Sequence, residues 1–568
     1  MKKVLSYLKP YTFRMFLGFL IKVSGTFMDL GLPWVLAYII DDIIPLGEIS
    51  YILWWGVIMI LLSIGARSCN ILANRMASRV ARDTTENLRH DLFVKILSLS
   101  GTQLDHFSVP SLVSRMTTDT YNIHQMIGMM QRLGVRAPII LVGGIIITST
   151  LEPVLTLVLV GVFPFLAYVV YLVSKKGIPL YKKLQLTTDH MVRVVRENIT
   201  GIRVIKALSK TAYEKNRFFD VNNEVVEKEL KAGTTMAITN PVMNLLLNIG
   251  LTLVVVVGAF RVNSGASEPG KIVAFLSYFT IMLQAVMAIT RIFVNFSKAS
   301  ASADRLSQVL LVEDDLKVID QTVNENSDSK EHIAFHHVTF SYTNEPCISD
   351  IDFSLKRGES LGIIGSTGSG KTTLINLLMR FYDVTDGNIT IEGKDIRSFD
   401  KQQLRKKFGV VFQNDVLFAD TVNENINLGR NIDQDQARVA AEHAQASAFI
   451  DDLDDTFEFK LAIKGSNLSG GQKQRLLISR ALAGKPDILI LDDSSSALDY
   501  KTDSLLRKAI REHYQNTTTI MIAQRISSVM KMDHILVIED GQMVGYGSHE
   551  DLLANCEVYQ EIYQSQLM

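Results

Sequence analysis

The chain has 568 residues, 47% of them hydrophobic, and its 58 basic side chains are balanced by 59 acidic ones for a formal net charge of −1. A near-zero net charge argues against a nucleic-acid partner, because phosphate binding needs a basic face. The three cysteines, Cys69, Cys347 and Cys556, lie far apart without metal-ligand spacing, which is typical of inert thiols in a reducing compartment.

The first half of the sequence is rich in long apolar runs. A helix needs roughly 20 apolar residues to cross a bilayer, and the segment 152–173 is apolar on all sides over such a length, which disfavours the alternative of buried helices in a large soluble core. We therefore predict an all-α membrane domain over residues 1–310. Its six membrane-spanning helices are expected near residues 16–40, 51–72, 126–149, 152–173, 240–260 and 272–294.

The connections between these runs differ in charge. Two long ones, about 73–125 and 174–235, are rich in Lys and Arg, whereas the short turns 41–50, 149–153 and 262–270 contain acidic side chains and no basic ones. The positive-inside rule then places the long loops, both termini and the second half of the chain in the cytoplasm, for a multi-pass protein of the plasma membrane. The long loops have helical patterning, and we expect them to act as coupling loops that extend the spans by roughly 30 Å.

The composition becomes polar and acidic over a predicted linker, residues 311–332. From residue 333 to 568 short β-rich runs alternate with helices, which predicts an α/β domain with a mainly parallel sheet. The runs are IAFHHVTFSY, SLGIIG, GNITIEG, FGVVFQ, DILILDD, TTIMIAQ and HILVIEDG.

A phosphate-binding loop follows the second of these runs. The stretch matches G-x-x-x-x-G-K-[ST], in which glycines let backbone N–H groups surround phosphates, the lysine reaches the β and γ phosphates, and the hydroxyl at the end can ligate Mg²⁺. Its position between a predicted strand and a predicted helix supports ATP and Mg²⁺ as cofactors. The predicted nucleotide-binding residues are Gly365, Ser366, Thr367, Gly368, Ser369, Gly370, Lys371, Thr372 and Thr373.

Three further motifs follow in order: LSGGQ at 468–472, ILILDD at 488–493 and SALD at 496–499. Together with the phosphate loop, they resemble the nucleotide-binding domain of an ATP-binding cassette (ABC) protein. The order of six spans followed by one such domain resembles the layout of an ABC exporter half-transporter of the multidrug type, and this resemblance covers the entire chain. The resemblance implies an ATP hydrolase coupled to transport, working with a second half-transporter subunit.

The resemblance also implies roles for individual residues. Tyr342 matches the aromatic that stacks on adenine, although an ordinary strand tyrosine is the alternative. Asp492 and Gln413 match the magnesium-contacting carboxylate and glutamine, beside Thr372. The signature residues Ser469, Gly470, Gly471 and Gln472 match the segment that closes on ATP held by the opposite subunit.

Two positions depart from the family pattern. Asp493 stands where the family has a catalytic Glu, and Gln524 where it has a histidine. A carboxylate drawn back by more than about 1 Å can lose a hundredfold in rate, and an amide cannot titrate near pH 7. We therefore expect this chain's own site to bind Mg-ATP and hydrolyse it poorly, in a heterodimer whose other site is completed by this chain's signature.

The sequence leaves the cargo open. Asp29 is expected near mid-membrane, where a carboxylate is costly unless it faces a wet cavity. It either lines the cavity and favours cationic amphiphiles or is a paired structural residue. Hydrophobic or amphipathic small molecules are the expected cargo, and the alternatives are a lipid flippase of the same architecture and a regulatory ATP-binding subunit.

Overall fold

The computed structural model describes residues 1–319, 331–343, 345–494 and 496–567, so residues 320–330 of the predicted linker lie outside the described residues. The chain divides into two compact units. The first consists of Met1–Leu97 and Pro110–Val312, and the second consists of Ser98–Val109 and Glu313–Met568.

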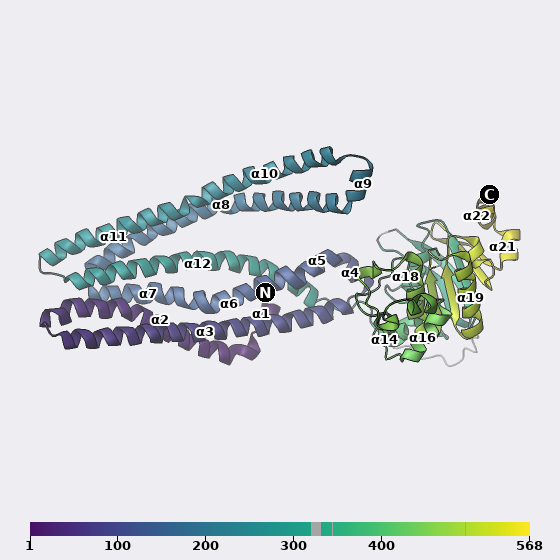
Figure 1. Ribbon diagram of the computed structural model, residues 1–568, viewed down its shortest axis with the longest axis horizontal. Helices are drawn as coiled ribbons and strands as arrows, with labels where there is room; N and C mark the ends of the chain where they lie inside the picture. The colour runs from purple at the N-terminus through teal and green to yellow at the C-terminus, as the bar shows by residue number, and fades with distance from the viewer. Residues whose placement is uncertain (320–330, 344, 495, 568) are drawn as a thin grey trace. The chain divides into compact units, whose positions relative to one another are not determined.

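The first unit is entirely helical, and its described residues contain six helices long and apolar enough to cross a membrane, as the sequence predicts. The helices α8 and α10 lie side by side and are joined by the short helix α9 (Figure 1). The helices carrying these spans are α1 (Lys2–Ser6), α2 (Thr12–Tyr38), α3 (Ile49–Ser98), α5 (Val109–Ser114), α6 (Thr120–Met129), α7 (Val135–Leu151), α8 (Pro153–Thr200), α9 (Ile202–Ala207), α10 (Thr211–Ala237), α11 (Thr239–Asn263) and α12 (Pro269–Leu310).

The packed centre of the first unit surrounds α12. Phe275, Tyr278, Phe279 and Met282 of α12 are fully buried against residues of α2, α7 and α11. The Tyr278 hydroxyl donates to the carbonyl oxygen of Leu30 at 2.6 Å, which satisfies the one polar atom that this cluster buries with its rings. Packing of α12 against three other helices accounts for the apolar character of this part of its sequence.

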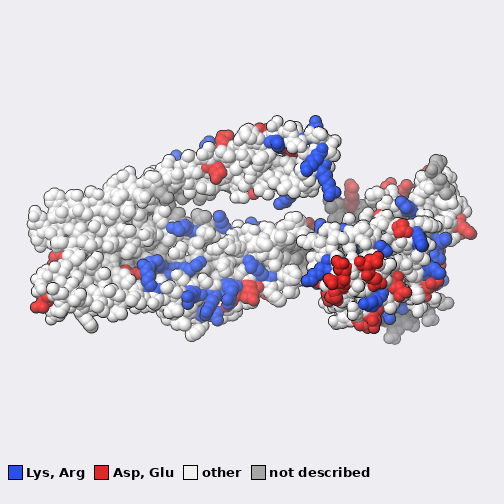
Figure 2. All heavy atoms as spheres, in the orientation of Figure 1, with Lys and Arg blue, Asp and Glu red and all other residues white. Residues whose placement is uncertain are grey.

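Charged side chains are unevenly distributed over the first unit. Figure 2 shows its Lys and Arg side chains gathered away from the ends where short turns join the helices, and a few acidic side chains near those ends. One of the acidic side chains, Asp41, accepts hydrogen bonds from the first backbone N–H groups of α12, those of Gly270 at 2.5 Å and Lys271 at 3.0 Å. The Asp41 carboxylate therefore caps the N-terminus of α12, and its negative charge interacts favourably with the positive end of the helix dipole.

The second unit is built on a ten-stranded sheet with the order β5-β4-β1-β2-β10-β9-β3-β8-β7-β6. Strands β9, β3, β8, β7 and β6 are mutually parallel, and the other half is mainly antiparallel. The strands are β1 (Glu331–Phe340), β2 (Ile348–Lys356), β3 (Ser360–Gly365), β4 (Asp386–Ile391), β5 (Lys394–Asp395), β6 (Phe408–Val411), β7 (Ile488–Asp492), β8 (Thr518–Ile522), β9 (His534–Glu539) and β10 (Gln542–Gly547).

Helices pack on this sheet and leave the carboxyl ends of the parallel strands to form a site, the usual arrangement in open α/β folds. Strands β7 and β8 are buried throughout, and β3 is buried except at its two end residues, which explains their continuous apolar sequences. The helices are α13 (Lys371–Leu378), α14 (Lys401–Lys406), α15 (Val422–Asn427), α16 (Gln434–His443), α17 (Ser447–Asp451), α18 (Gly470–Ala483), α19 (Tyr500–His513), α20 (Ile526–Val529), α21 (His549–Asn555) and α22 (Glu557–Leu567).

The second unit includes a helix from the first long loop, α4 (Gly101–Phe107). Ser100 caps this helix, and the N–H of Gly101 donates to the carbonyl oxygen of Phe381 at 3.0 Å. The hydroxyl of Tyr382 donates to the Asp105 carboxylate at 2.7 Å. A Cβ on Gly101 would lie 2.5 Å from the Tyr382 ring, so only glycine permits this close packing.

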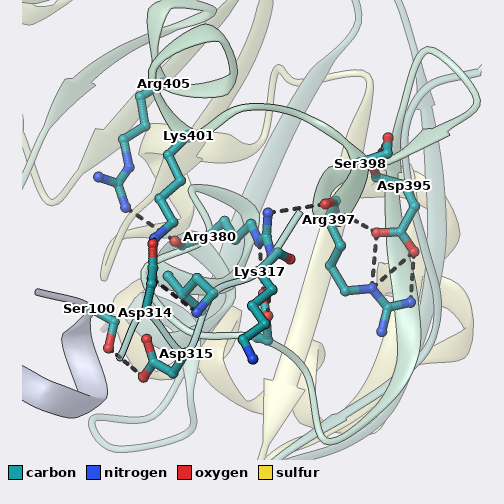
Figure 3. A network of polar contacts seen from close by, with 12 residues as sticks. Ser100, Asp314, Asp315, Lys317, Arg380, Asp395, Arg397, Ser398, Lys401 and Arg405 are labelled. Atoms are coloured by element: carbon teal, nitrogen blue, oxygen red, sulfur yellow. Dashed lines mark hydrogen bonds and ion pairs between the residues drawn. The ribbon is translucent and has the colours of Figure 1, made fainter. Parts of the chain in front are cut away.

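A polar network joins the segment after α12 to the same part of the sheet domain (Figure 3). The Ser100 hydroxyl donates to Asp315 at 2.7 Å, and Lys401 donates to Asp314 at 2.5 Å. Arg380 is fully buried and donates to the carbonyl oxygen of Lys317 at 2.7 Å. Both segments that continue into the membrane helices are thus fixed on one surface of the second unit.

Candidate nucleotide-binding site

The predicted phosphate loop connects β3 to α13 and curves tightly around the ammonium of Lys371. Gly370 has a φ of +100°, and a Cβ there would lie 2.6 Å from Ile348. Lys371 donates from Nζ to the carbonyl oxygens of Gly365 at 3.0 Å and Ser366 at 2.5 Å. The loop and the first N–H groups of α13 therefore surround a cationic centre, which is the chemistry that binds phosphates.

The carboxylate of Asp492 stands at the end of β7, next to this loop. Its side chain is only 3% exposed, and the Thr372 hydroxyl donates to it at 3.1 Å. A hydroxyl and a carboxylate are oxygen ligands of the kind that Mg²⁺ prefers. These two side chains together with Lys371 fit Mg-ATP, and bound Mg²⁺ would offset phosphate charge there.

Burial shapes the electrostatics of this site. It raises the pKa of Asp492, while the hydrogen bond from Thr372 opposes the rise and the charge of Asp493 adds to it. Burial likewise raises the pKa of Asp493, opposed by Arg525 and Lys371. Burial lowers the pKa of Lys371, and the charges of Asp492 and Asp493 partly offset this by raising it. The site thus holds two carboxylates whose charged forms are costly until a cation arrives.

The two residues that depart from the family pattern are in contact. Asp493 follows β7 with a φ of +48°, and Gln524 follows the neighbouring strand β8. The Nε2 atom of Gln524 donates to Oδ2 of Asp493 at 3.1 Å. One oxygen of the Asp493 carboxylate is therefore engaged by an uncharged amide.

The structure places Tyr342 beside the phosphate loop. Its ring is 46% exposed, and its hydroxyl donates to Thr373 Oγ1 at 3.4 Å. The rings of Phe340 and Tyr382 contact it edge to face, with centroids 4.8 and 5.1 Å away. An exposed ring face next to the loop is available for stacking on a base.

Tyr382 itself was missed by sequence reasoning. It contacts both Tyr342 and, through Asp105, helix α4. The aromatic pair Phe381-Tyr382 directly after α13 is the only signal in the sequence that could have suggested it.

The other predicted residues lie apart from this cluster. Ser469 and Gln472 form a capping box at the start of α18, with Ser469 N–H to Gln472 Oε1 at 2.8 Å. Ser469 and Gly470 are exposed. No hydrogen bond among the described residues joins the signature to the phosphate loop. Gln413 is exposed just beyond β6 and makes no hydrogen bond with Asp492 or Thr372 in the described part of the chain.

Asp29 lies within the first unit and lines a cavity there. Its carboxylate is 7% exposed and accepts from Arg136 Nη2 at 3.0 Å and from Asn70 Nδ2 at 3.2 Å. Asp29 therefore lies in the wall of a cavity and is also paired with Arg136. The expected preference for cations is not supported, because Arg136 already neutralises this carboxylate.

A phosphate loop at the end of the parallel strand β3, a carboxylate at the end of β7 two strands away, and six preceding apolar helices define an ATP-binding membrane transport protein. The chain belongs to the ABC transporter family. Residues 15–286 match the ABC transporter transmembrane region, and residues 348–496 match the ABC transporter nucleotide-binding family. The chain is an ABC exporter half-transporter, a multi-pass membrane protein that binds ATP and couples its hydrolysis to transport.

Relatives of similar length share this organisation. The ABC transporter ATP-binding protein YfiB of Bacillus subtilis is 35% identical over 100% of this chain and 98% of its own length. An ATP-dependent lipid A-core flippase of Methylobacillus flagellatus is 32% identical over 86% of this chain and 83% of its own. A solved bacterial Atm1-family ABC exporter with ATP bound has the same fold, with a TM-score of 0.82 over 98% of this chain and 99% of that chain at 23% identity.

Proposed function

We propose that this chain is the subunit with the degenerate ATP site in a heterodimeric exporter that moves hydrophobic or amphipathic compounds out of the cytoplasm or the inner leaflet. The proposal includes cytoplasmic placement of both termini and of the nucleotide-binding domain. Its own site binds Mg-ATP and hydrolyses it slowly, whereas its signature, Ser469 to Gln472, completes the active site of the partner.

The observation that carries this proposal is the hydrogen bond between Gln524 and Asp493. A general base must reach the proton of the attacking water. The Asp493 carboxylate is one methylene shorter than the usual glutamate, and one of its oxygens accepts from an amide that carries no charge. Two weakened groups in one catalytic unit leave nucleotide binding intact and slow the chemical step.

A homodimer of this chain would contain two such sites and no fast one. A heterodimer places one slow and one fast site in the same assembly, with the partner supplying the phosphate loop, Glu and His of the fast site. The exposed start of α18, with its capping box formed, supports a signature ready to receive a nucleotide from another chain.

The purified chain alone and the complex with its co-purified partner provide the test. The chain alone should bind ATP and hydrolyse it slowly, and the complex should turn over faster per mole of sites. Rapid ATP turnover by the chain alone would contradict the heterodimer proposal, and absence of ATP-dependent transport by the complex would contradict export.

A lipid flippase of the same architecture is the second candidate. It is favoured by the similarity to a protein named a lipid A-core flippase. ATP-dependent movement of a fluorescent phospholipid between leaflets of proteoliposomes would distinguish it from export of a soluble amphiphile into the medium.

A further inference from the structure

The first unit contains a cavity of about 890 Å³. Its walls come from helices α2, α3, α7 and α12 and from Leu133 in the turn before α7. A volume of this size accommodates a drug-sized or lipid-sized portion of a ligand. The cavity walls are mainly apolar and include four ionisable side chains, Asp29, Arg67, Arg136 and Arg291.

The three arginines and the isoleucines of the lining lie at different levels along the helix axes. At 1.5 Å per residue, Arg67, Arg136 and Arg291 lie about 22–33 Å from the helix ends that the short turns join. Apolar lining residues of the same helices, such as Ile60, Ile140 and Ile281, lie only about 16–18 Å from those ends. The three arginines of the cavity therefore lie at one level, together with apolar residues such as Leu133 and Met287, and the isoleucines form an apolar level next to it.

The basic level has an excess of positive charge. Arg136 is paired with Asp29, whose carboxylate also accepts from Asn70. Arg67 and Arg291 are exposed and, among the described residues, neither has an ion-pair or hydrogen-bond partner for its guanidinium. Arginine stays protonated at all working pH values, so this level presents two positive charges without an acidic counterpart.

We infer that this cavity binds an amphiphile with an anionic headgroup, such as a phosphate, which pairs with Arg67 and Arg291 while its apolar chain lies against the isoleucine level. The inference rests on the proposed export of amphipathic compounds and names their class. A planar guanidinium binds phosphate and carboxylate oxygens in bidentate fashion. In a cavity with apolar walls, such pairs are screened less than on the surface.

A cationic amphiphile is disfavoured by the same contacts. Its headgroup would lie against unneutralised guanidiniums, and the one carboxylate within reach is already paired. The headgroup chemistry is shared by two sources, an anionic membrane lipid and a free anionic amphiphile. The experiment below separates them.

The test uses the full chain in nanodiscs of phosphatidylcholine, without nucleotide. Dodecyl phosphate and dodecyltrimethylammonium serve as free anionic and cationic probes with the same chain length, and their dissociation constants are measured by calorimetry. Phosphatidylglycerol mixed into the nanodisc serves as the lipid probe, and its retention relative to phosphatidylcholine is measured by native mass spectrometry. We expect preference for the anionic member of each pair.

Substitutions locate the site. Arg67→Gln and Arg291→Gln should each weaken binding of dodecyl phosphate about three- to tenfold. Asp29→Asn should strengthen it, because Arg136 then lacks its counter-ion. Arg203→Gln, in α9 outside the cavity, removes the same charge from an exposed position and should change nothing.

Each outcome decides the question. Retention of phosphatidylglycerol identifies a lipid ligand, and binding of dodecyl phosphate alone identifies a free amphiphile. Three results would overturn the inference. They are binding of dodecyltrimethylammonium as tight as or tighter than that of dodecyl phosphate, no detectable binding of either anionic probe, and a loss of dodecyl phosphate affinity in Arg203→Gln equal to that in the cavity variants. The binding measurement needs no ATP, so it stays valid even if the proposed transport cycle is wrong. Conversely, ATP-dependent export of cations alone would contradict the anionic ligand and leave the transport proposal intact.

Discussion

Gln524 and Asp493 follow adjacent parallel strands, and the amide of the first donates to the carboxylate of the second over 3.1 Å. The bond holds the carboxylate toward β8 with a group that cannot accept a proton. The site that we propose to be slow therefore contains two residues that contact one another, and we expect substitutions at the two positions to act together.

Restoring both residues should speed hydrolysis. In the double variant Asp493→Glu with Gln524→His, the longer carboxylate reaches the water and the imidazole can hold the γ-phosphate. We expect the steady-state ATPase rate of the chain alone to rise at least about tenfold, since the two defects cost about a hundredfold or more. The same double variant carrying Lys371→Ala serves as the background control. An unchanged rate would mean that other features limit turnover.

The affinity for Mg-ATP should fall on acidification. Mg²⁺ needs a deprotonated Asp492, and the pKa of that carboxyl is raised by burial, so protons compete with the metal at higher pH than at an ordinary aspartate. Dissociation constants measured from pH 7.5 to about 5 should increase with Mg²⁺ present. ATP binding in excess chelator, which depends on the loop and Lys371, is the control and should change less over the same range.

The same pKa shift fixes the sign of an effect on stability. A carboxyl with a folded-state pKa above its unfolded value destabilises the folded protein as pH rises through the interval between the two. Asp492→Asn should therefore raise the melting temperature of the nucleotide-free chain at pH 7.5. A gain of about 1 kcal/mol in the free energy of unfolding corresponds to a rise of about 2–4 °C. The difference from the unmodified chain should shrink as the pH is lowered, and a lower melting temperature at pH 7.5 would contradict the assignment.

The signature serine has a matched control in this chain. Ser469 and Ser548 each form a capping box, at the starts of α18 and α21. Ser469→Ala and Ser548→Ala should each cost about 1 kcal/mol of local helix stability. In the complex with the partner, only Ser469→Ala should lower ATP turnover, by about a hundredfold if its donors contact phosphate in the transition state. Equal rates in the two variants would remove the signature from the partner's site.

Tyr382 should affect coupling more than nucleotide binding. Tyr382→Phe keeps the ring against Tyr342 and removes the hydroxyl that donates to Asp105 of α4. A hydrogen bond to a charged group contributes about 1.5–3 kcal/mol, so its loss should weaken the attachment of α4. We expect the substrate-stimulated ATPase rate to fall about tenfold while the affinity for ATP stays the same. Tyr546→Phe, which removes a hydroxyl donating to Ser354 within the sheet at 2.7 Å, is the control. A parallel loss of ATP affinity would indicate a role in the nucleotide site.

Much of the fold could be predicted because its strongest signals are local. The six spans are long and apolar, and seven buried or edge strands have clear β-rich runs. Three strands were missed. Acidic residues alternate with the apolar ones of β2, as its half-buried pattern requires, and the two glycines and exposed residues of β10 resemble a turn. Strand β5 consists of two residues only. The phosphate loop was predicted from its motif between a strand and a helix, and the roles of Asp492 and Asp493 from the resemblance of ILILDD to the family pattern.

The contacts between these elements could not be predicted in the same way. The Gln524–Asp493 bond joins residues 31 positions apart and depends on side-chain conformation at the ends of two paired strands. Asp29 and Arg136 are 107 positions apart, and their pairing neutralises a carboxylate that the sequence alone presents as an isolated intramembrane charge. Neither relationship has a signature in spacing or composition.

Helix α4 is part of the soluble unit although it is encoded between two membrane helices. During synthesis its residues leave the ribosome about two hundred positions before the sheet domain that it packs against. The nucleotide-binding domain can reach its complete packing only after the intervening helices have been made, so a fragment beginning at the linker would expose the aromatic surface around Tyr382. The complete packing of the nucleotide-binding domain therefore includes a helix that is supplied by the membrane half of the chain.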